Sequence, residues 1–267
     1  MLPIISSDEL RKIRNAIENK KQETEASLDL GITKTKIRLG SSCFYFGESA
    51  IEIPGIRDDD KSCYVVSGRE LQKVQFFSNG KLYKLVPTSN RPILQISGTS
   101  MHKKEFVQRV EKDRLTGKVL DSGTGLGYTA VAAAKTAAQV ITVEMDRTVI
   151  DIARLNPYSK DLFEKSNIKQ VSGDIVDEIK KFSDSEFDFA VFDAGTPHSS
   201  SSFFSLANYR EAYRVLKKKG RIYHYLPRAH ISRGRDFGAE AISRIKKAGF
   251  ARIKRNMLGS YAVAEKS

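Results

Sequence analysis

The sequence has few cysteines and no long apolar segment. Its 267 residues include two cysteines, Cys43 and Cys63, which have neither the spacing nor the histidine cluster of a metal site. We therefore expect no metal and two reduced cysteines, with a disulfide between them as the alternative. No stretch approaches the ~18 consecutive apolar residues of a membrane span. The first residues lack the basic start, apolar core and cleavage site of a secretory signal, so we expect a cytoplasmic protein.

Internal repeats and extended low-complexity tracts are also missing, apart from four serines at positions 199–202. A chain of this length with 40% hydrophobic residues buries a complete doubly wound core and leaves about a hundred residues for an accessory module. We predict an α/β protein in which residues 1–100 form an N-terminal helix and a small β-rich module. We predict that residues 101–267 form a second domain, which binds a nucleotide-like cofactor.

The N-terminal hundred residues change pattern partway. Residues 7–28 are polar, with Leu10, Ile13 and Ile17 at helical spacing, which predicts a surface or docking helix. Short β-type runs follow from position 42 to 97, and Asn79-Gly80 between two of them predicts a hairpin. This module is expected to bind substrate, to form a homo-oligomer, or to cover a pocket.

The positive charge is concentrated at the C-terminal end. The formal net charge of +13 divides into +3 for residues 1–100, −2 for 101–200 and +12 for 201–267. Such residues often lie on a solvated helix face or near helix C-termini. So one-sided a charge also attracts an anionic partner such as RNA, DNA or a phosphorylated metabolite.

The most informative stretch is KVLDSGTGLG at positions 118–127. An apolar run ends in Asp121 and continues into three alternating glycines, Gly123, Gly125 and Gly127, and the alanine-rich residues 128–138 have helical character. This predicts a strand, a tight loop and a helix N-terminus, where the backbone amides of the loop would hold a nucleoside cofactor. An ordinary glycine-rich turn is the alternative reading. Two neighbours of the glycines, Thr124 and Tyr128, complete the predicted cofactor loop.

Three further acids end apolar strands downstream. Glu144 lies 23 positions after Asp121, at the tip of the second strand, where a carboxylate accepts hydrogen bonds from ribose hydroxyls. Asp174 follows a third short strand and is predicted to face an adenine edge. Asp193 ends the apolar strand FDFAVFD. Because ligands of open α/β sheets bind outside the carboxyl ends of the strands, the four acids predict one site.

Residues 118–263 resemble a class I S-adenosylmethionine-dependent methyltransferase. More narrowly, six segments resemble the archaeal predicted methyltransferases related to spermidine synthases: KLYKLVPT, GLGYTAV, ARLNPYS, YREAYRVLK, GRIYHY and RGRD. The resemblance implies a Rossmann-like doubly wound seven-stranded sheet that binds S-adenosylmethionine. This chain departs from that family at one loop. From the acid that ends the fourth strand, those proteins usually read D-P-P-R, whereas this chain reads Asp193-Ala194-Gly195-Thr196-Pro197-His198.

Candidates for the chemistry surround the predicted cofactor. Methyl transfer from a sulfonium requires an oriented acceptor, and Asp193 is the expected residue nearest the transfer, able to accept a proton or a hydrogen bond. His102 is the second catalytic candidate. Four residues are predicted to line the acceptor site, although a structural role is the alternative for any one histidine: His224, Tyr225, Arg233 and Arg235.

Three functions compete at this point. The first is a methyltransferase that uses S-adenosylmethionine on an unidentified acceptor, a small molecule or RNA. The second is an aminopropyltransferase that uses decarboxylated S-adenosylmethionine, which the C-terminal positive charge disfavours because polyamine acceptors are cations. The third is a non-catalytic binding module that retains the nucleoside pocket.

Overall fold

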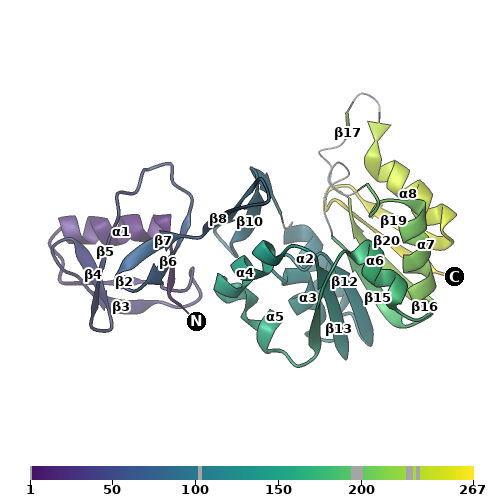
Figure 1. Ribbon diagram of the computed structural model, residues 1–267, viewed down its shortest axis with the longest axis horizontal. Coiled ribbons are helices and arrows are strands. Elements are labelled where there is room, and N and C mark those ends of the chain that lie inside the picture. Colours follow the sequence, from purple (N-terminus) through teal and green to yellow (C-terminus); the bar gives the residue numbers. More distant parts are fainter. Residues whose placement is uncertain (1, 102–103, 194–200, 227–230, 233–234) are drawn as a thin grey trace. The chain divides into compact units, whose positions relative to one another are not determined.

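The computed structural model describes residues 2–101, 104–193, 201–226, 231–232 and 235–267, with only the backbone for residues 231, 232 and 235. The chain forms two compact units (Figure 1). The first comprises residues 1–101 together with 151–160, and the second comprises residues 102–150 and 161–267.

The first unit begins with a capped helix. Helix α1 (Ser7–Glu18) starts where the Ser6 hydroxyl accepts a hydrogen bond from the Glu9 N–H (3.1 Å). Leu10 and Ile13 on one face of it are buried, as their spacing predicts. The predicted end near position 28 is wrong, because Lys20 adopts a left-handed φ of 54° and the following residues pair as β2 (Glu23–Ala26) with β3 (Thr35–Arg38).

Small antiparallel sheets make up the rest of this unit. The predicted hairpin at Asn79-Gly80 is confirmed: these residues take φ values of 50° and 70° and connect β8 to β9. Cys63 is buried and Cys43 is half-buried, and both are free thiols in the structure. The strands form three groups: β1 (Ile4–Ser6), β6 (Cys63–Ser67) and β7 (Glu70–Lys73); β4 (Cys43–Phe46) and β5 (Ser49–Glu52); β8 (Gln75–Ser78), β9 (Lys81–Val86), β10 (Ile93–Ile96) and β11 (Thr99–Ser100).

The second unit contains the predicted seven-stranded sheet, in the order β14-β13-β12-β15-β16-β20-β19. Its first five strands are parallel, and β20 is antiparallel to both of its neighbours, β16 and β19. The strands are β12 (Lys118–Ser122), β13 (Gln139–Glu144), β14 (Ile168–Ser172), β15 (Phe187–Phe192), β16 (Leu216–Tyr225), β19 (Phe250–Asn256) and β20 (Tyr261–Lys266).

Helices cover both faces of this sheet, with α2 and α3 on one side and α6, α7 and α8 on the other (Figure 1). This is the doubly wound arrangement that the sequence predicts. The helices are α2 (Lys104–Asp113), α3 (Tyr128–Ala133), α4 (Arg147–Leu155), α5 (Lys160–Glu164), α6 (Ile175–Glu178), α7 (Leu206–Val215) and α8 (Phe237–Lys247). Short 3-10 turns at Pro157–Ser159 and Ile179–Lys181 and the strand pair β17 (Ile231–Ser232) and β18 (Arg235–Asp236) complete the elements.

The core of the second unit lies between the sheet and helices α7 and α8. Phe187 and Phe192 of β15 are fully buried, and Tyr209 of α7 and Ile245 of α8 pack in the same cluster. Because the central strands are covered on both faces, their sequences are continuous apolar runs, and polar side chains appear where the strands end. The four predicted acids therefore belong to the carboxyl edge of the sheet, the edge at which the parallel strands end.

Candidate nucleoside-binding site

The glycine loop between β12 and α3 has the conformation that only glycine adopts without strain. Gly123, Gly125 and Gly127 have φ values of 73°, 55° and 77°. A β-carbon on Gly127 would also lie 2.7 Å from a methyl carbon of Leu162. The loop therefore requires glycine for its turn and for its close packing, in addition to any ligand.

Four backbone N–H groups of this loop donate hydrogen bonds within the protein. The Gly123 and Thr124 N–H groups donate to the Val143 carbonyl oxygen at 2.9 and 3.1 Å. The Gly125 N–H donates to Glu144 Oε2 (3.0 Å), and the Gly127 N–H donates to the Thr124 carbonyl oxygen (2.7 Å). Three left-handed residues curl the chain back onto β13, so the Gly123, Thr124 and Gly125 amides bind the end of the neighbouring strand. Because its glycines carry no side chains, the loop allows a ligand to approach the backbone closely. The four N–H groups named here already have acceptors within the protein.

Asp121 is the most unusual group at the carboxyl edge. It is fully buried, and its Oδ2 accepts a hydrogen bond from the Thr142 hydroxyl (2.7 Å), which lies 2.6 Å from the Thr124 hydroxyl. The Thr129 hydroxyl lies near enough to lower the pKa of this carboxyl, but among the described residues Oδ1 has no partner at hydrogen-bond geometry. Burial raises the pKa of Asp121 to about 7, and the Asp193 and Glu144 carboxylates act in the same direction. A buried carboxylate with an open oxygen is suited to a cationic ligand.

Glu144 ends β13 and is held at both oxygens. Oε2 accepts from the Gly125 N–H and Oε1 accepts from the Asp146 N–H, each at 3.0 Å. Burial raises the pKa of Glu144, and these backbone donors oppose that shift. Each carboxylate oxygen has a second lone pair, so the anchored carboxylate retains acceptor capacity for hydroxyl groups.

Asp174 has a structural partner of its own. It is the N-cap of α6, where its Oδ1 accepts from the Val176 N–H (2.9 Å). The residue is half-buried just beyond the end of β14, next in the sheet to β13. Asp174 thus lies at the same edge as Glu144.

Asp193 follows the end of β15, next to β12. Its N–H donates to the Ser122 hydroxyl (3.2 Å) and to the Ser122 carbonyl oxygen (3.3 Å), which ties the end of β15 to the end of β12. Burial and the nearby Asp193 carboxylate raise the pKa of Tyr225, at the end of β16, to about 12. Asp121, Asp193 and Tyr225 are therefore near neighbours in the folded chain.

His224 is buried, with 1% of its surface exposed. Its Nδ1 lies 3.1 Å from the carbonyl oxygen of Phe192, so Nδ1 carries the proton, and its Nε2 accepts from the Tyr209 hydroxyl (2.8 Å). Burial lowers the pKa of His224 to about 3, and the Phe204 ring stacks on the imidazole at 5.3 Å. The structure thus places His224 in the core rather than at an open surface, as a neutral group holding the residue that precedes Asp193.

The remaining predicted residues belong to segments without a described side chain. His102 and Arg233 lie outside the described residues, as does the loop at 194–200 in which the sequence departs from its family. Arg235 is described only by its backbone, in β18. Of the predicted site residues with described side chains, those at the carboxyl edge of the sheet are Asp121, the three glycines, Glu144, Asp174, Asp193 and Tyr225.

Two side chains at this edge escaped prediction. Thr142 is a fully buried hydroxyl inside an apolar strand, and that polar interruption was the available signal. Met145 directly follows Glu144 and is 68% exposed. A large exposed apolar side chain beside the acid offers packing surface for a flat ligand.

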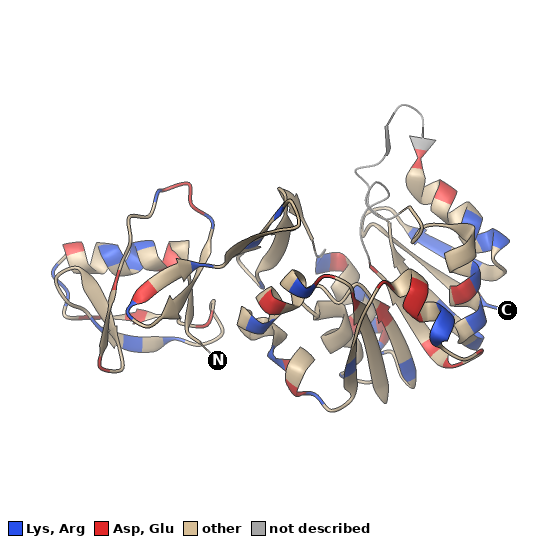
Figure 2. Ribbon diagram, viewed as in Figure 1, with Lys and Arg blue, Asp and Glu red and all other residues tan. Residues whose placement is uncertain are grey.

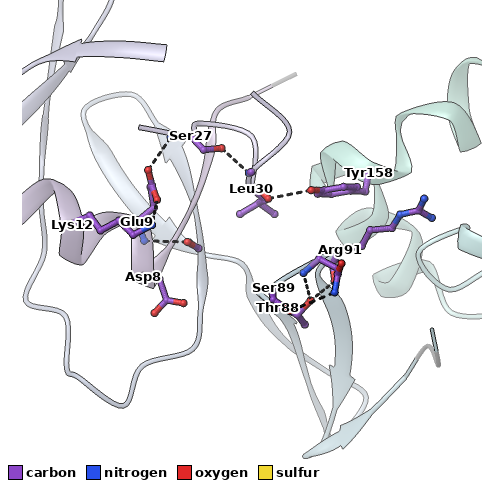
Figure 3. Close-up of a pocket in the computed structure, with 12 residues that line it drawn as sticks. Asp8, Glu9, Lys12, Ser27, Leu30, Thr88, Ser89, Arg91 and Tyr158 are labelled. Atoms are coloured by element: carbon purple, nitrogen blue, oxygen red, sulfur yellow. Dashed lines mark hydrogen bonds and ion pairs between the residues drawn. The ribbon is translucent and has the colours of Figure 1, made fainter. Parts of the chain in front are cut away.

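A separate open cavity of about 490 Å³ lies in the first unit. Figure 3 shows its polar wall, with Glu9 of α1 beside Ser27 and with Tyr158 pointing toward Leu30. Glu9 Oε1 accepts from the Ser27 N–H (3.0 Å), and the Tyr158 hydroxyl donates to the Leu30 carbonyl oxygen (3.4 Å). No predicted site residue with a described side chain lines this cavity.

Two searches of the described residues gave negative results. They contain no group of three or more His, Cys, Asp or Glu side chains placed to hold a metal ion. None of their helices has the length and apolar character of a membrane span.

The sequence is similar to that of known methyltransferase domains and of one archaeal protein. The family model described as a methyltransferase domain matches residues 115–254. An uncharacterized protein from Methanocaldococcus jannaschii is 34% identical over 269 residues, which cover 94% of this chain and 92% of that protein.

Solved structures share the fold. A spermidine synthase in complex with the transition state analogue AdoDATO superposes with a TM-score of 0.59 at 21% identity, over 72% of this chain and 73% of that one. The spermidine synthase from Thermotoga maritima gives a TM-score of 0.57 at 20% identity, over 72% of each chain. The chain therefore belongs to the methyltransferase-domain family, in the class I group whose fold is related to that of spermidine synthases.

Proposed function

We propose that the protein transfers a methyl group from S-adenosylmethionine to an anionic acceptor, an RNA or a phosphorylated small molecule. The observation that carries this proposal is the buried Asp121 carboxylate, whose Oδ1 lacks a described partner at the base of the three-glycine loop. S-adenosylmethionine carries a sulfonium and an ammonium group. A buried anion with an open oxygen favours such a cationic ligand over a neutral one.

Each predicted cofactor residue has a role in this proposal. Glu144, fixed by two backbone donors, would accept hydrogen bonds from the ribose hydroxyls, and Asp174 would face the adenine edge. The loop glycines would let the ligand approach the backbone. Thr124 and Tyr128 are both buried and would support the loop from inside.

When bound, S-adenosylmethionine supplies an electrophilic methyl carbon on its sulfonium. The chain itself must then orient the acceptor in line with that carbon. Asp193 is proposed to accept the acceptor's proton or a hydrogen bond from it, since it ends the strand next to β12 and is tied to Ser122. His102 is proposed as the second catalytic residue. Tyr225, Arg233 and Arg235 are proposed to line the acceptor site, the arginines as partners for phosphate or carboxylate.

His224 receives a different role in this proposal. Both of its ring nitrogens are engaged, so it would position the end of β15, and thereby Asp193, without meeting the acceptor. The domain division at residue 100 and a homo-oligomer formed through the N-terminal module remain proposals.

Aminopropyl transfer is the second candidate, because the fold is shared with spermidine synthases. Decarboxylated S-adenosylmethionine would serve as donor and Asp193 would deprotonate an attacking amine. The excess of basic residues in the C-terminal quarter opposes a polyamine acceptor, which is itself cationic.

Thermal-shift titration tests the donor. Because a ligand that binds only the folded state raises the melting temperature, we expect S-adenosylmethionine to stabilise the protein more than its decarboxylated form or NAD. Greater stabilisation by NAD contradicts the assignment of the site. Greater stabilisation by the decarboxylated donor favours aminopropyl transfer.

Mass spectrometry of cell extract incubated with the enzyme and isotope-labelled donor tests the transfer. The mass added to the product distinguishes a methyl from an aminopropyl group. Its carrier identifies the acceptor. Stabilisation by S-adenosylmethionine without any labelled product, even with extract of the source organism, would favour the non-catalytic binding module.

A further inference from the structure

A group of lysines lies at the edge of the central sheet opposite the glycine loop. This amino edge is where the parallel strands begin, since Phe187 of β15 pairs with Leu216 of β16 there. The ladder is irregular until Phe189 pairs with Arg221, so residues 217–220 form a bulge of β16, in which Lys219 has a left-handed φ of 64°. Lysines at positions 217–219 are all exposed.

The last turn of α8 reaches the same edge. Lys266 pairs in register with Phe250 at the start of β19, and its ammonium donates to the Leu216 carbonyl oxygen (2.6 Å). The α8–β19 junction is thereby fixed beside the 217–220 bulge. Lys246 and Lys247, which end α8, are both exposed, and Figure 2 shows this basic end of the helix.

These charges are neutralised only in part by local acids. Lys217 binds Asp188 (2.9 Å), and Arg221 and Arg252 share the single carboxylate of Glu265 (3.3 and 2.9 Å). Over the part of the chain that the structure describes, four lysines have no ion pair: Lys218, Lys219, Lys246 and Lys247. We call these four residues together with Arg252 the basic edge.

The basic edge lacks apolar anchors. The exposed large hydrophobic residues of the described second unit are Met145, Met257 and Leu258. Met145 follows β13, and the other two follow β19, which runs parallel to β16, so all three lie at the carboxyl edge. Peripheral membrane surfaces combine basic residues with inserted apolar ones, and this surface presents only charge.

The two edges are separated by the length of the strands. Strands β12, β13 and β15 have five, six and six residues, which at ~3.3 Å per residue places the edges about 16 to 20 Å apart. A phosphate group on a small metabolite at the glycine loop does not reach the basic edge. A ligand that binds both the transfer site and these lysines must carry negative charges along the whole distance between the two edges.

We infer that the basic edge is a docking surface for the phosphate backbone of a nucleic acid, separate from the proposed transfer site. Lysine ammonium groups bind phosphates as point charges and release counterions on binding, which gives affinity without sequence specificity. The surface would hold an RNA or DNA chain by its backbone while another part of that chain extends around the domain.

Charge-matched variants test this inference. The edge variant K218Q/K219Q/K246Q/K247Q removes four positive charges. The control K20Q/K21Q/K34Q/K61Q removes four exposed lysines of the first unit that have no ion pair within the described structure. Fluorescence anisotropy would measure binding of labelled single- and double-stranded RNA, DNA of the same lengths, and vesicles of anionic lipid over a range of salt concentrations.

We expect the wild type and the control to bind RNA or DNA with similar, steep salt dependence. In the edge variant the slope of log K against log salt should fall by about 3, at ~0.7 per phosphate contact, and affinity at moderate salt should fall at least about tenfold. Equal weakening in the edge variant and the control, binding to vesicles alone, or no binding to nucleic acid at low salt would overturn the inference.

The experiments can contradict the docking surface without contradicting the proposed methyl transfer, and the reverse. Stabilisation by S-adenosylmethionine should be the same in the edge variant and the wild type, because the lysines lie at the other end of the strands. Nucleic-acid binding without any donor binding would remove the methyltransferase proposal and leave the docking surface. The comparison of RNA with DNA identifies which backbone the surface prefers.

Discussion

The two edges of the central sheet differ in their charged groups: acids end β12 to β15 at the carboxyl edge, and exposed lysines of β16 and α8 lie at the amino edge. At the carboxyl edge the acids are buried or half-buried: the Asp121, Glu144 and Asp174 carboxylates accept hydrogen bonds, and the Asp193 backbone N–H donates to Ser122. At the amino edge the lysines are exposed and mostly without partners. An enclosed group of acids suits a small cation, and an open group of lysines suits a long polyanion. The proposed transfer site and the proposed docking surface therefore lie at opposite edges of the sheet.

Loss of the Asp193 carboxylate should have the largest effect. We expect Asp193→Asn to reduce methyl transfer into cell extract by about 10² to 10⁴-fold, because the variant cannot take up the acceptor's proton. Donor-induced thermal stabilisation should be retained. The control is Asp184→Asn at the other edge, an exposed acid paired with Arg214, which should leave transfer unchanged. Full activity in Asp193→Asn would remove Asp193 from the mechanism.

A β-carbon in the glycine loop should be the next most damaging change. Gly127→Ala combines a left-handed φ of 77° with a contact of 2.7 Å to Leu162, whereas Gly98→Ala has a φ of 83° and open space around it. The control should lose about 1 kcal/mol of unfolding free energy and Gly127→Ala a further ~1–3 kcal/mol, together with donor binding. Chemical denaturation and thermal-shift titration measure the two effects. Equal losses would show that the close packing of this loop is unimportant.

The pH dependence of donor binding sharpens the comparison further. Burial raises the pKa of Asp121 from 3.8 to about 7, so between these values the folded state holds a proton that the unfolded state has lost. The free energy of unfolding therefore falls as pH rises through this window and levels off above it. A cationic donor favours the ionised form, so its affinity should rise by up to about tenfold per pH unit until pH 7.

Asp121→Asn tests this assignment because it cannot ionise. Calorimetric titration at several pH values should show proton release on donor binding by the wild type and a flatter profile for the variant. Identical pH profiles would mean that another group accounts for the titration.

The smallest predicted effect concerns the core behind Asp193. Tyr209→Phe removes the hydroxyl that donates to the neutral His224 and should cost about 1 kcal/mol of unfolding free energy. Tyr213→Phe on the same helix is the control, since its hydroxyl forms no hydrogen bond within the described residues. Urea denaturation compares the two variants. An equal loss in both would argue against the tyrosine–histidine hydrogen bond.

Much of the fold could be predicted because local patterns report it. The Asn79-Gly80 hairpin and the three left-handed glycines follow from the φ values those residues tolerate. The acid-tipped strands follow from the burial of a parallel sheet on both faces. The end of α1 was missed because pairing between β2 and β3, a tertiary interaction, overrides the helical propensity of residues 19–28.

The sequence by itself determined the order of the elements, the glycine loop and the acids that follow the strands, since each depends on residues close together in the chain. Only the tertiary structure decided that the Gly123, Thr124 and Gly125 amides bind β13, that Asp121 keeps an open oxygen, and that His224 is buried. It also decided that the lysines gather at the opposite edge from the acids. These properties depend on strand order and register, which bring together residues up to a hundred positions apart and which no local pattern encodes.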